Sequence, residues 1–345
     1  MQIKVDSIQL IGKALITTVP FGDKNRLPLE LLETAGIEYL INPLGRKLTE
    51  QELADIIPGF EVLISGTEPI TNHVMQRGKN LKMISRVGIG LDSVDLLAAE
   101  RRGIKVSYTP DAPAPAVAEL TVGLMLSLLR STHLSNLWMH NGQWHRHFGR
   151  RLSEVTIGII GVGRIGKRVV RLLSGFNCKR IMVNDLLTNQ KIDERVEVKW
   201  RDKETIYRES NLITLHVPLT ANTKNMIRRE ELEMMKPDAI VINTARGGII
   251  NERDLYDVMQ AGHLAGAAVD VFEEEPYSGP LSEIERCLLT AHMGSMSVDC
   301  RTRMEVEASE EVICFLTGRP LEKEVPDVEY AVQREGLVGS GSIDV

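Results

Sequence analysis

The sequence lacks an excess of basic residues, and this argues against one large class of function. Its 345 residues carry 41 Lys and Arg against 47 Asp and Glu, a formal net charge of -6 at pH 7. Proteins that bind nucleic acid usually present a basic patch on a basic domain. No nucleic-acid partner is therefore expected, and an anionic ligand would have to be held by local positive charge.

Cysteines and long apolar runs are also scarce. Cys178, Cys287, Cys300 and Cys314 form no C-x-x-C pair, so neither a disulfide framework nor a metal site is predicted. Charges interrupt the N-terminal "MQIKVDSIQLIGK", unlike the apolar core of a secretory signal. No run approaches the ~20 apolar residues of a membrane-spanning helix. We expect a reduced, cytoplasmic protein without a metal ion or a membrane segment.

Two series of alternating strands and helices are present instead. From Lys13 to Tyr108, apolar runs of strand length alternate with amphipathic segments, and a second such series runs from Val155 to His292. This alternation is typical of parallel sheets covered by helices. A chain longer than ~250–300 residues usually forms more than one domain. The sequence therefore predicts two α/β domains.

The segments outside these series carry their own patterns. "TPDAPAP" before Ala116 is expected neither to continue a strand nor to lie inside a helix. The helix predicted from Ala116 to Arg130 is apolar nearly all round, so we expect it to be buried between domains or subunits. A long helix is predicted from Val298 to Leu316. The final "EGLVGSGSIDV" is rich in Gly and Ser, which favours a flexible end.

A glycine-rich turn opens the second series. In "VTIGIIGVGRIG", Gly161, Gly163 and Gly166 follow a strand and begin a helix, the context of a dinucleotide-binding turn. Asp185, at the end of the next predicted strand, could accept hydrogen bonds from a ribose and repel a 2′-phosphate. NAD is therefore favoured over NADP. Asn184 would take this position if the strand register shifted by one.

Three polar residues each follow a later predicted strand. Arg246 follows "VINTA", Glu275 follows "VDVFEE" and His292 follows "LLTA". Ligands of open parallel sheets bind at this carboxyl edge. Arg can hold a carboxylate bidentately, and a His beside a Glu can exchange the proton of a hydroxyl. Each residue alone could be a surface charge, part of a solvated acidic run or an ordinary strand-end histidine. Together they suit hydride transfer between nicotinamide and C2 of a 2-hydroxy acid.

These blocks resemble the D-isomer-specific 2-hydroxyacid dehydrogenases. The resemblance rests on "RVGIGLDSVDL", "GIIGVGRIGKRV", "HVPLTANTKNMI", "INTARGGIINERDL", "GAAVDVFEEEP" and "TAHMGSMS". It implies an α/β fold of two doubly wound parallel-sheet domains, with a Rossmann NAD-binding domain inserted into a flavodoxin-like substrate domain. The expected substrate domain comprises residues 1–108 and 297–330, the NAD-binding domain 109–296, and a flexible tail 331–345.

The resemblance also implies roles for individual residues. Arg246 and His292 would bind the substrate, with His292 as acid/base supported by Glu275. Backbone N–H groups around Val87 and Gly88 would receive the substrate carboxylate. Asp270 would face the nicotinamide amide, although by itself it suits a buried capping residue. The full set of expected NAD contacts is Val117, Gly161, Gly163, Arg164, Ile165, Gly166, Asp185, His216, Pro218, Thr223, Thr244, Ala245, Asp270 and Gly294.

The chain departs from the family in ways that bear on function. Phosphoglycerate dehydrogenases tend to carry basic residues after the third strand, where this chain has Ser65 and Glu68, and this disfavours a phosphorylated substrate. Ser295 stands where a second glycine is usual. A different class of function, an NAD-sensing corepressor-like binding protein, shares this fold and its site residues, and it remains the alternative.

The connector "WMHNGQWHRHFGRR" gathers aromatic and histidine side chains. Without Cys or carboxylates at ligand spacing it does not predict a metal site. In the family this region lies in the dimer arm, so a homodimer is expected. Trp144 or His147 could shape the partner's substrate pocket, or the connector could simply pack against the preceding helix.

Overall fold

The chain folds into two compact units, and the second is inserted in the first. The computed structural model describes residues 10–178, 180–188, 192–193 and 195–339. Unit 1 comprises Met1–Pro113 and Ser297–Val345, and unit 2 comprises Ala114–Met296. The first break lies at Pro113, a few residues later than the expected boundary after residue 108.

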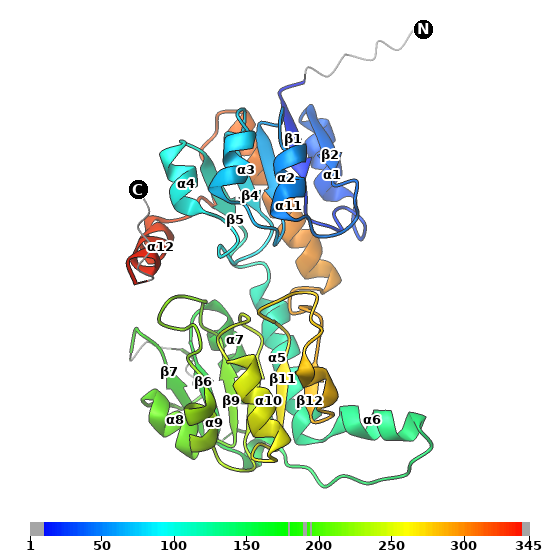
Figure 1. Ribbon diagram of the computed structural model, residues 1–345, viewed down its shortest axis with the longest axis vertical. Coiled ribbons are helices and arrows are strands. Elements are labelled where there is room, and N and C mark those ends of the chain that lie inside the picture. Colours follow the sequence, from blue (N-terminus) through cyan, green and yellow to red (C-terminus); the bar gives the residue numbers. More distant parts are fainter. Residues whose placement is uncertain (1–9, 179, 189–191, 194, 340–345) are drawn as a thin grey trace. The chain divides into compact units, whose positions relative to one another are not determined.

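Unit 1 is built on a five-stranded parallel sheet with the order β2-β1-β3-β4-β5 (Figure 1). This is the flavodoxin-like doubly wound order, as expected. The strands are β1 (Gly12–Ile16), β2 (Ile37–Ile41), β3 (Val62–Ser65), β4 (Met83–Arg86) and β5 (Lys105–Tyr108). The helices are α1 (Leu27–Thr34), α2 (Glu50–Ile56), α3 (Asn72–Arg77), α4 (Leu96–Arg101), α11 (Val298–Leu316) and α12 (Asp327–Gly339). Side chains of α2, α3 and α4 form one apolar core with the sheet, and α1 and α11 pack together and complete the unit.

Helix α12 differs from the flexible tail expected from residue 331. The Gln333 side chain donates to the Val94 carbonyl at 2.7 Å and accepts from the Leu96 N–H at 3.0 Å. Arg334 pairs with Glu100 at 2.7 Å. The Gly and Ser content at the end of the chain concealed these contacts with α4. Residues 340–345 of the expected tail lie outside the described residues.

Unit 2 contains a seven-stranded parallel sheet with the order β12-β11-β10-β9-β6-β7-β8. The strands are β6 (Ile157–Ile160), β7 (Ile181–Asn184), β8 (Val198–Trp200), β9 (Leu212–Leu215), β10 (Ile240–Asn243), β11 (Gly266–Val269) and β12 (Cys287–Leu289). The helices are α5 (Ala114–Leu129), α6 (Thr132–His140), α7 (Arg164–Leu173), α8 (Lys203–Glu209), α9 (Arg229–Met234) and α10 (Glu252–Gln260). Three short 3₁₀ turns cover Leu152–Glu154, Ser174–Phe176 and Pro280–Glu283. Strand β8 was not predicted, because it has three residues at the sheet edge and none is fully buried.

The two faces of this sheet are covered by different helices. Side chains of α5 and α7 form one core, and those of α8, α9 and α10 form the other. Helix α5 begins at Ala114, so Pro115 lies in its first turn, where a missing N–H costs no helical hydrogen bond. The expectation that "TPDAPAP" stays outside the helix is therefore wrong at its end. Buried side chains of α5 from Ala118 to Leu129 belong to the core of unit 2.

Within the described part of the chain, no single helix is long and apolar enough to cross a membrane. Helices α5 and α6 together have the length and the apolar composition of a membrane-spanning segment, but the chain bends by 65° between them.

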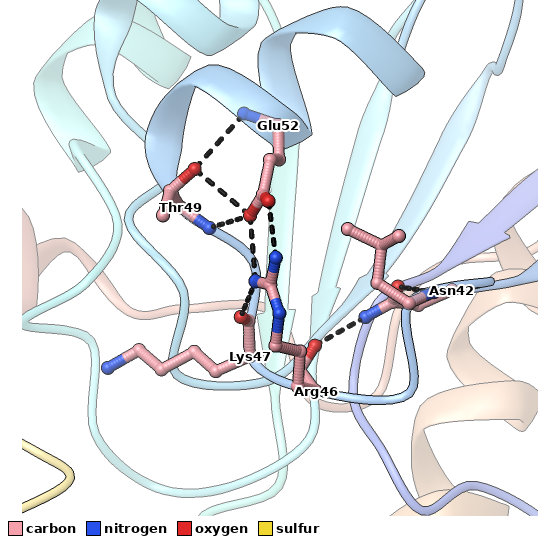
Figure 2. A network of polar contacts seen from close by, with 6 residues as sticks. Asn42, Arg46, Lys47, Thr49 and Glu52 are labelled. Carbon is pink, nitrogen blue, oxygen red and sulfur yellow. Dashed lines mark hydrogen bonds and ion pairs between the residues drawn. The ribbon is translucent and has the colours of Figure 1, made fainter.

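A polar network fixes the start of α2 (Figure 2). The Thr49 N–H donates to Glu52 Oε2 at 2.9 Å, and the Glu52 N–H donates to Thr49 Oγ1 at 3.3 Å. This reciprocal capping box satisfies backbone donors that the first helical turn leaves unpaired. The Arg46 guanidinium holds the same carboxylate through both oxygens, at 2.5 and 2.9 Å. These contacts, led by Arg46 and followed by the Thr49 N–H, lower the pKa of Glu52 from 4.5 to about 2.

This lowered pKa makes the contribution of Glu52 to stability depend on pH. A carboxyl with a lowered folded-state pKa stabilises the fold above its unfolded pKa of 4.5, and this stabilisation is lost as pH falls toward about 2. Glu52→Gln should therefore reduce the free energy of unfolding at pH 7, and the deficit should shrink below pH 4.5. Urea denaturation across this range measures the difference.

Lys47→Ala is the matched control for Glu52→Gln. The Lys47 side chain points away from Glu52 (Figure 2), and only the Lys47 carbonyl accepts from Arg46. This variant should follow the wild-type pH dependence. An equal deficit of Glu52→Gln at pH 3 and pH 7 would contradict the role of the charge.

Candidate active site

Three neighbouring strands carry the three polar residues singled out in the sequence. Strands β10, β11 and β12 lie side by side, and Arg246, Glu275 and His292 follow them in that order. The strands are parallel, so their carboxyl ends share one edge of the sheet. The loops with Arg246, Glu275 and His292 therefore belong to one edge.

His292 and Glu275 are in direct contact. His292 Nδ1 lies 3.0 Å from Glu275 Oε1 and 2.9 Å from Oε2. We infer that Nδ1 carries a proton, since a carboxylate only accepts. Nε2 is then the ring nitrogen left for proton exchange, and the His292 side chain is 37% exposed. The Phe272 N–H donates to Glu275 Oε1 at 3.2 Å and helps to hold the carboxylate.

Asp270 holds the loop that carries His292 through hydrogen bonds. Its side chain is 1% exposed. Its Oδ1 accepts from Thr290 Oγ1 at 2.6 Å and from the Met293 N–H at 2.9 Å, and its Oδ2 accepts from the Gly294 N–H at 2.9 Å. Burial raises the pKa of Asp270, and these hydrogen bonds oppose that effect. The structure thus shows Asp270 as a buried capping residue of this loop, while the expected contacts of Asp270 with the nicotinamide amide and of Gly294 with NAD stay predictions.

The Arg246 loop is shaped by residues that the sequence did not single out. The Asn243 amide donates to the Arg246 carbonyl at 2.8 Å and accepts from the Ala245 N–H at 3.1 Å. Arg246 Nη1 donates to the Ala245 carbonyl at 2.6 Å. A Cβ at Gly247 would lie 2.1 Å from the Phe272 carbonyl carbon, so glycine lets the loops after β10 and β11 touch. The signals were a polar Asn ending an apolar strand and the two glycines after Arg246.

The glycine turn has two crowded positions and one open position. Gly161 has φ +93°, and a Cβ there would lie 2.4 Å from the His216 carbonyl oxygen. A Cβ at Gly166 would lie 2.0 Å from the Gly161 carbonyl oxygen. A Cβ at Gly163 would meet no described atom within 4 Å. Gly163 precedes Arg164 and Ile165, which begin α7, and it thus leaves open space at the N-terminus of that helix.

The strand register decides between Asp185 and Asn184. Asn184 is the last residue of β7 and pairs with Ile160; its amide donates to the Arg201 carbonyl at 2.8 Å. Asp185 Oδ2 accepts from the Val162 N–H in the glycine turn at 2.7 Å. Asp185, and not Asn184, therefore faces the turn. A cavity of about 430 Å³ is lined by Gly163 and by Arg164, Lys167, Arg168 and Arg171 of α7.

His216 lies at the end of β9, behind the glycine turn. Its Nε2 is 3.0 Å from Thr214 Oγ1, and its Nδ1 is buried with no partner among the described residues. Burial lowers its pKa from 6.5 to about 3. His216 is therefore neutral over the working range of most enzymes, and it is unsuited to exchange protons there.

The other predicted contacts of unit 2 lie in two loops and on α5. Thr223 Oγ1 donates to the Pro218 carbonyl at 2.6 Å and so closes that loop. The hydroxyl of Thr244, which precedes Ala245, lies 2.8 Å from the hydroxyl of Thr121 on α5. A Cβ at Gly294 would lie 3.2 Å from the Val117 side chain, also on α5. No group of three or more His, Cys, Asp or Glu in the described chain could hold a metal ion.

The loop with Val87 and Gly88 lies in unit 1, after β4. The Val87 N–H donates to the Ser65 carbonyl at 2.9 Å, and the Gly88 N–H donates to Thr109 Oγ1 at 2.8 Å. These two N–H groups are therefore already bonded within unit 1, and the expectation that N–H groups around Val87 and Gly88 receive a carboxylate stays a prediction. The backbone donors of Ile89 and Gly90 have no acceptor among the described residues.

The comparisons with known proteins agree on one family. Residues 122–294 match the family model described as D-isomer specific 2-hydroxyacid dehydrogenase, NAD binding domain. A hydroxypyruvate reductase of Thermotoga maritima is 39% identical over 276 residues, 77% of this chain and 88% of the relative. A D-3-phosphoglycerate dehydrogenase of Methanocaldococcus jannaschii is 37% identical over 81% of this chain, which spans only 54% of that relative.

Solved structures give the same result. The crystal structure of the TT0316 protein from Thermus thermophilus superposes with a TM-score of 0.82 at 31% identity. The match covers 91% of this chain and 100% of that one. Two-domain α/β architecture is therefore shared over nearly the whole described chain.

The contrast between Gly161 and Gly163 predicts opposite effects of the same substitution. Gly161→Ala places a methyl group against backbone at positive φ and should lower the free energy of unfolding by at least about 2 kcal/mol. Gly163→Ala meets open space and should cost less than about 1 kcal/mol. Chemical denaturation of both variants measures this, and equal destabilisation would contradict the crowding argument.

Proposed function

The chain belongs to the D-isomer specific 2-hydroxyacid dehydrogenase family, and we propose that it reduces a small, unphosphorylated 2-keto acid at the edge with Arg246, Glu275 and His292. It is an NAD-dependent oxidoreductase acting on 2-hydroxy or 2-keto acids. The observation that carries the proposed site is the contact between His292 and Glu275 at 2.9 Å. The comparisons offer no support for the corepressor-like alternative.

The cofactor is NAD, and the glycine turn fits it. The open position at Gly163, the N-terminus of α7 and the basic side chains beside them suit a pyrophosphate. Asp185 would bond the ribose and repel a 2′-phosphate. Bound NADH supplies the hydride for C2 of the substrate. Ile165, Pro218, Thr223, Thr244 and Ala245 would line the remainder, and Gly163→Ala should then also lower NADH affinity.

Arg246, His292 and Glu275 would each have a different role in the reaction. Arg246 would bind the substrate carboxylate through its planar guanidinium, which matches the two carboxylate oxygens. His292 Nε2 would donate a proton to the keto oxygen during reduction and take it back during oxidation. Glu275, in contact with Nδ1, would orient the ring so that Nε2 is the nitrogen that exchanges the proton. His216 is not proposed as the acid/base, because its pKa is lowered to about 3.

The proposed substrate class rests on what lies after β3. Ser65 and Glu68 are buried there, where phosphoglycerate dehydrogenases tend to carry basic residues. A phosphate group would find no cation on this segment. The 39% identical relative named as a hydroxypyruvate reductase supports a short keto acid.

The decisive experiment measures NADH oxidation with glyoxylate, hydroxypyruvate and 3-phosphohydroxypyruvate. We expect turnover of the first two. His292→Gln should lower turnover by about 10²–10⁴-fold, since general acid catalysis contributes that much. His73→Gln, on the exposed surface of α3, is the matched control and should retain activity. Activity of His292→Gln at the wild-type level would overturn the acid/base assignment.

We also propose a homodimer in the cytoplasm. Helix α6 extends from the body of unit 2 (Figure 1), and none of its residues is buried. Trp144 and Phe148 after it are 80% and 104% exposed, although Trp138, His145 and His147 pack in tilted and edge-to-face contacts with ring centroids 4.6–5.0 Å apart. A second copy of the chain would cover the apolar side chains of this arm, which consists of α6 and the residues after it up to Phe148. The four cysteines are free thiols, which suits a reducing compartment.

Sedimentation at micromolar concentration tests the dimer. The wild type should sediment as a dimer and the double variant Trp144→Ala, Phe148→Ala as a monomer, because two large apolar contacts are removed. Leu186→Ala is the matched control, since Leu186 is 98% exposed outside the arm. A monomeric wild type would exclude both the dimer and any role of Trp144 or His147 in a partner's site.

A further inference from the structure

Glu275 lies on a segment without regular secondary structure, in the loop after β11. Glu273, Glu274 and Pro276 around it are exposed. A segment of this kind samples many conformations unless contacts restrict it. Both carboxylate oxygens of Glu275 nevertheless lie next to His292 Nδ1, at 3.0 and 2.9 Å. Contacts elsewhere in unit 2 must therefore hold this segment in one conformation.

Two aromatic rings join the ends of the segment that carries Glu275. Phe272 lies three residues before Glu275 and Tyr277 two residues after it, and their rings stack with centroids 4.2 Å apart and planes inclined by 20°. Aromatic pairs in contact stabilise a structure beyond the area that they bury. Phe272 is buried in the core formed with α8, α9 and α10, and Tyr277 packs against the same core. The segment is thus a short turn whose two ends are fixed to each other.

The backbone of Phe272 contacts both loops of the candidate site. Its N–H donates to Glu275 Oε1 at 3.2 Å, so the ring that Tyr277 covers belongs to the residue that bonds the carboxylate. Its carbonyl group lies so close to Gly247, in the loop with Arg246, that only glycine fits there. A movement of the Phe272 ring would therefore reach Glu275, and Tyr277 is the aromatic side chain that restricts this movement.

Tyr277 is itself held in place. Its hydroxyl accepts a hydrogen bond from the Leu281 N–H at 3.1 Å, and Leu281 is fully buried in the same core. A Cβ at Gly279 would lie 2.5 Å from Tyr277 Cζ, so glycine lets the ring lie against the chain at this point. The Tyr277 ring is thus fixed on one face by Phe272 and at its hydroxyl by the chain that follows.

We propose that Tyr277 is a positioning residue of the candidate active site: by stacking on Phe272 it holds the Glu275 carboxylate against His292 Nδ1. Nε2 is thereby kept as the ring nitrogen that exchanges the proton. This inference rests on the proposed function and adds to it a residue that acts through Glu275. The effect is geometric, and a displacement of about 1 Å in an active site can lower the rate by about 10²-fold.

The test measures kcat for glyoxylate and KM for NADH with Tyr277→Leu and Tyr277→Phe. Tyr277→Leu removes the stacked ring and should lower kcat by at least about 10-fold. The KM for NADH should stay within about twofold of the wild-type value, because the glycine turn is unchanged. Tyr277→Phe keeps the ring and loses only the hydroxyl, so its kcat should stay within about threefold of the wild type.

Two results of this experiment would overturn the role of the stacked rings while leaving the proposed function intact. One is a wild-type kcat in Tyr277→Leu, and the other is an equal loss of kcat in Tyr277→Leu and Tyr277→Phe. Failure of the wild type to reduce any keto acid would overturn both the role of Tyr277 and the proposed function.

A double variant separates positioning from a general loss of structure. Glu275→Ala leaves no carboxylate to position, so adding Tyr277→Leu to it should lower kcat further by less than about twofold. A further loss as large as in the wild-type background would show a general effect on unit 2 and overturn the proposal.

Tyr256→Leu is the matched control. Tyr256 lies on α10, its ring packs against the same core as Tyr277, and the Arg253 guanidinium lies 5.3 Å from its centroid. The same substitution at this position should leave kcat at the wild-type value. A loss equal to that of Tyr277→Leu would show that any change in this core lowers activity, and it would overturn the proposal.

Gly279→Ala keeps the proposal testable should Tyr277→Leu fail to fold. The added methyl group would lie 2.5 Å from Tyr277 Cζ, so it must displace the ring from its position on Phe272. The backbone at Gly279 has φ −86°, which alanine adopts without strain. Gly279→Ala should therefore lower kcat by at least about threefold. A kcat equal to that of the wild type would overturn the proposal.

Discussion

The candidate site depends on the hydrogen bonds that the buried carboxylate of Asp270 accepts. It follows β11, yet it bonds the hydroxyl and the two N–H groups of the loop after β12. His292 lies between those donors with φ +47°, a conformation that few residues other than glycine adopt. Asp270 therefore holds a strained backbone in the form that puts Nδ1 against Glu275. Without it, parallel strands would bring the loops near each other but would not orient the ring.

Close backbone contacts play the same part elsewhere along this edge. Gly247 lets the loop with Arg246 contact the chain at Phe272, Gly161 lets the glycine turn approach the His216 carbonyl after β9, and Gly166 lets α7 lie close to the turn. Gly163 is different, because its missing side chain leaves open space. The glycines of this fold thus serve two separate purposes, compact packing and access for a ligand, and only the second is expected to vary with the ligand.

Much of this arrangement could be predicted from the sequence, for physical reasons. Buried parallel strands are continuous apolar runs, so their ends, and hence the positions of Arg246, Glu275 and His292, are visible as the points where polarity returns. The sequence favours Asp185 but leaves Asn184 open, because a shift of one residue reverses a strand's side chains. The bonded N–H groups of Val87 and Gly88, and the anchoring of α12 by Gln333, depend on partners distant in the chain. Such contacts leave no local pattern.

The covering of the unit 1 sheet by α11 has a consequence for biosynthesis. Strands β1 to β5 leave the ribosome first, whereas α11, which packs on α1 and accepts from Ser85 through the Ala308 carbonyl at 3.0 Å, is made only after all of Ala114–Met296. The part of the nascent sheet that α11 covers therefore stays exposed until the whole of unit 2 has been translated. Exposed faces of this kind are where folding intermediates aggregate. Because unit 2 is inserted in unit 1, the unit whose synthesis starts first is thus completed last.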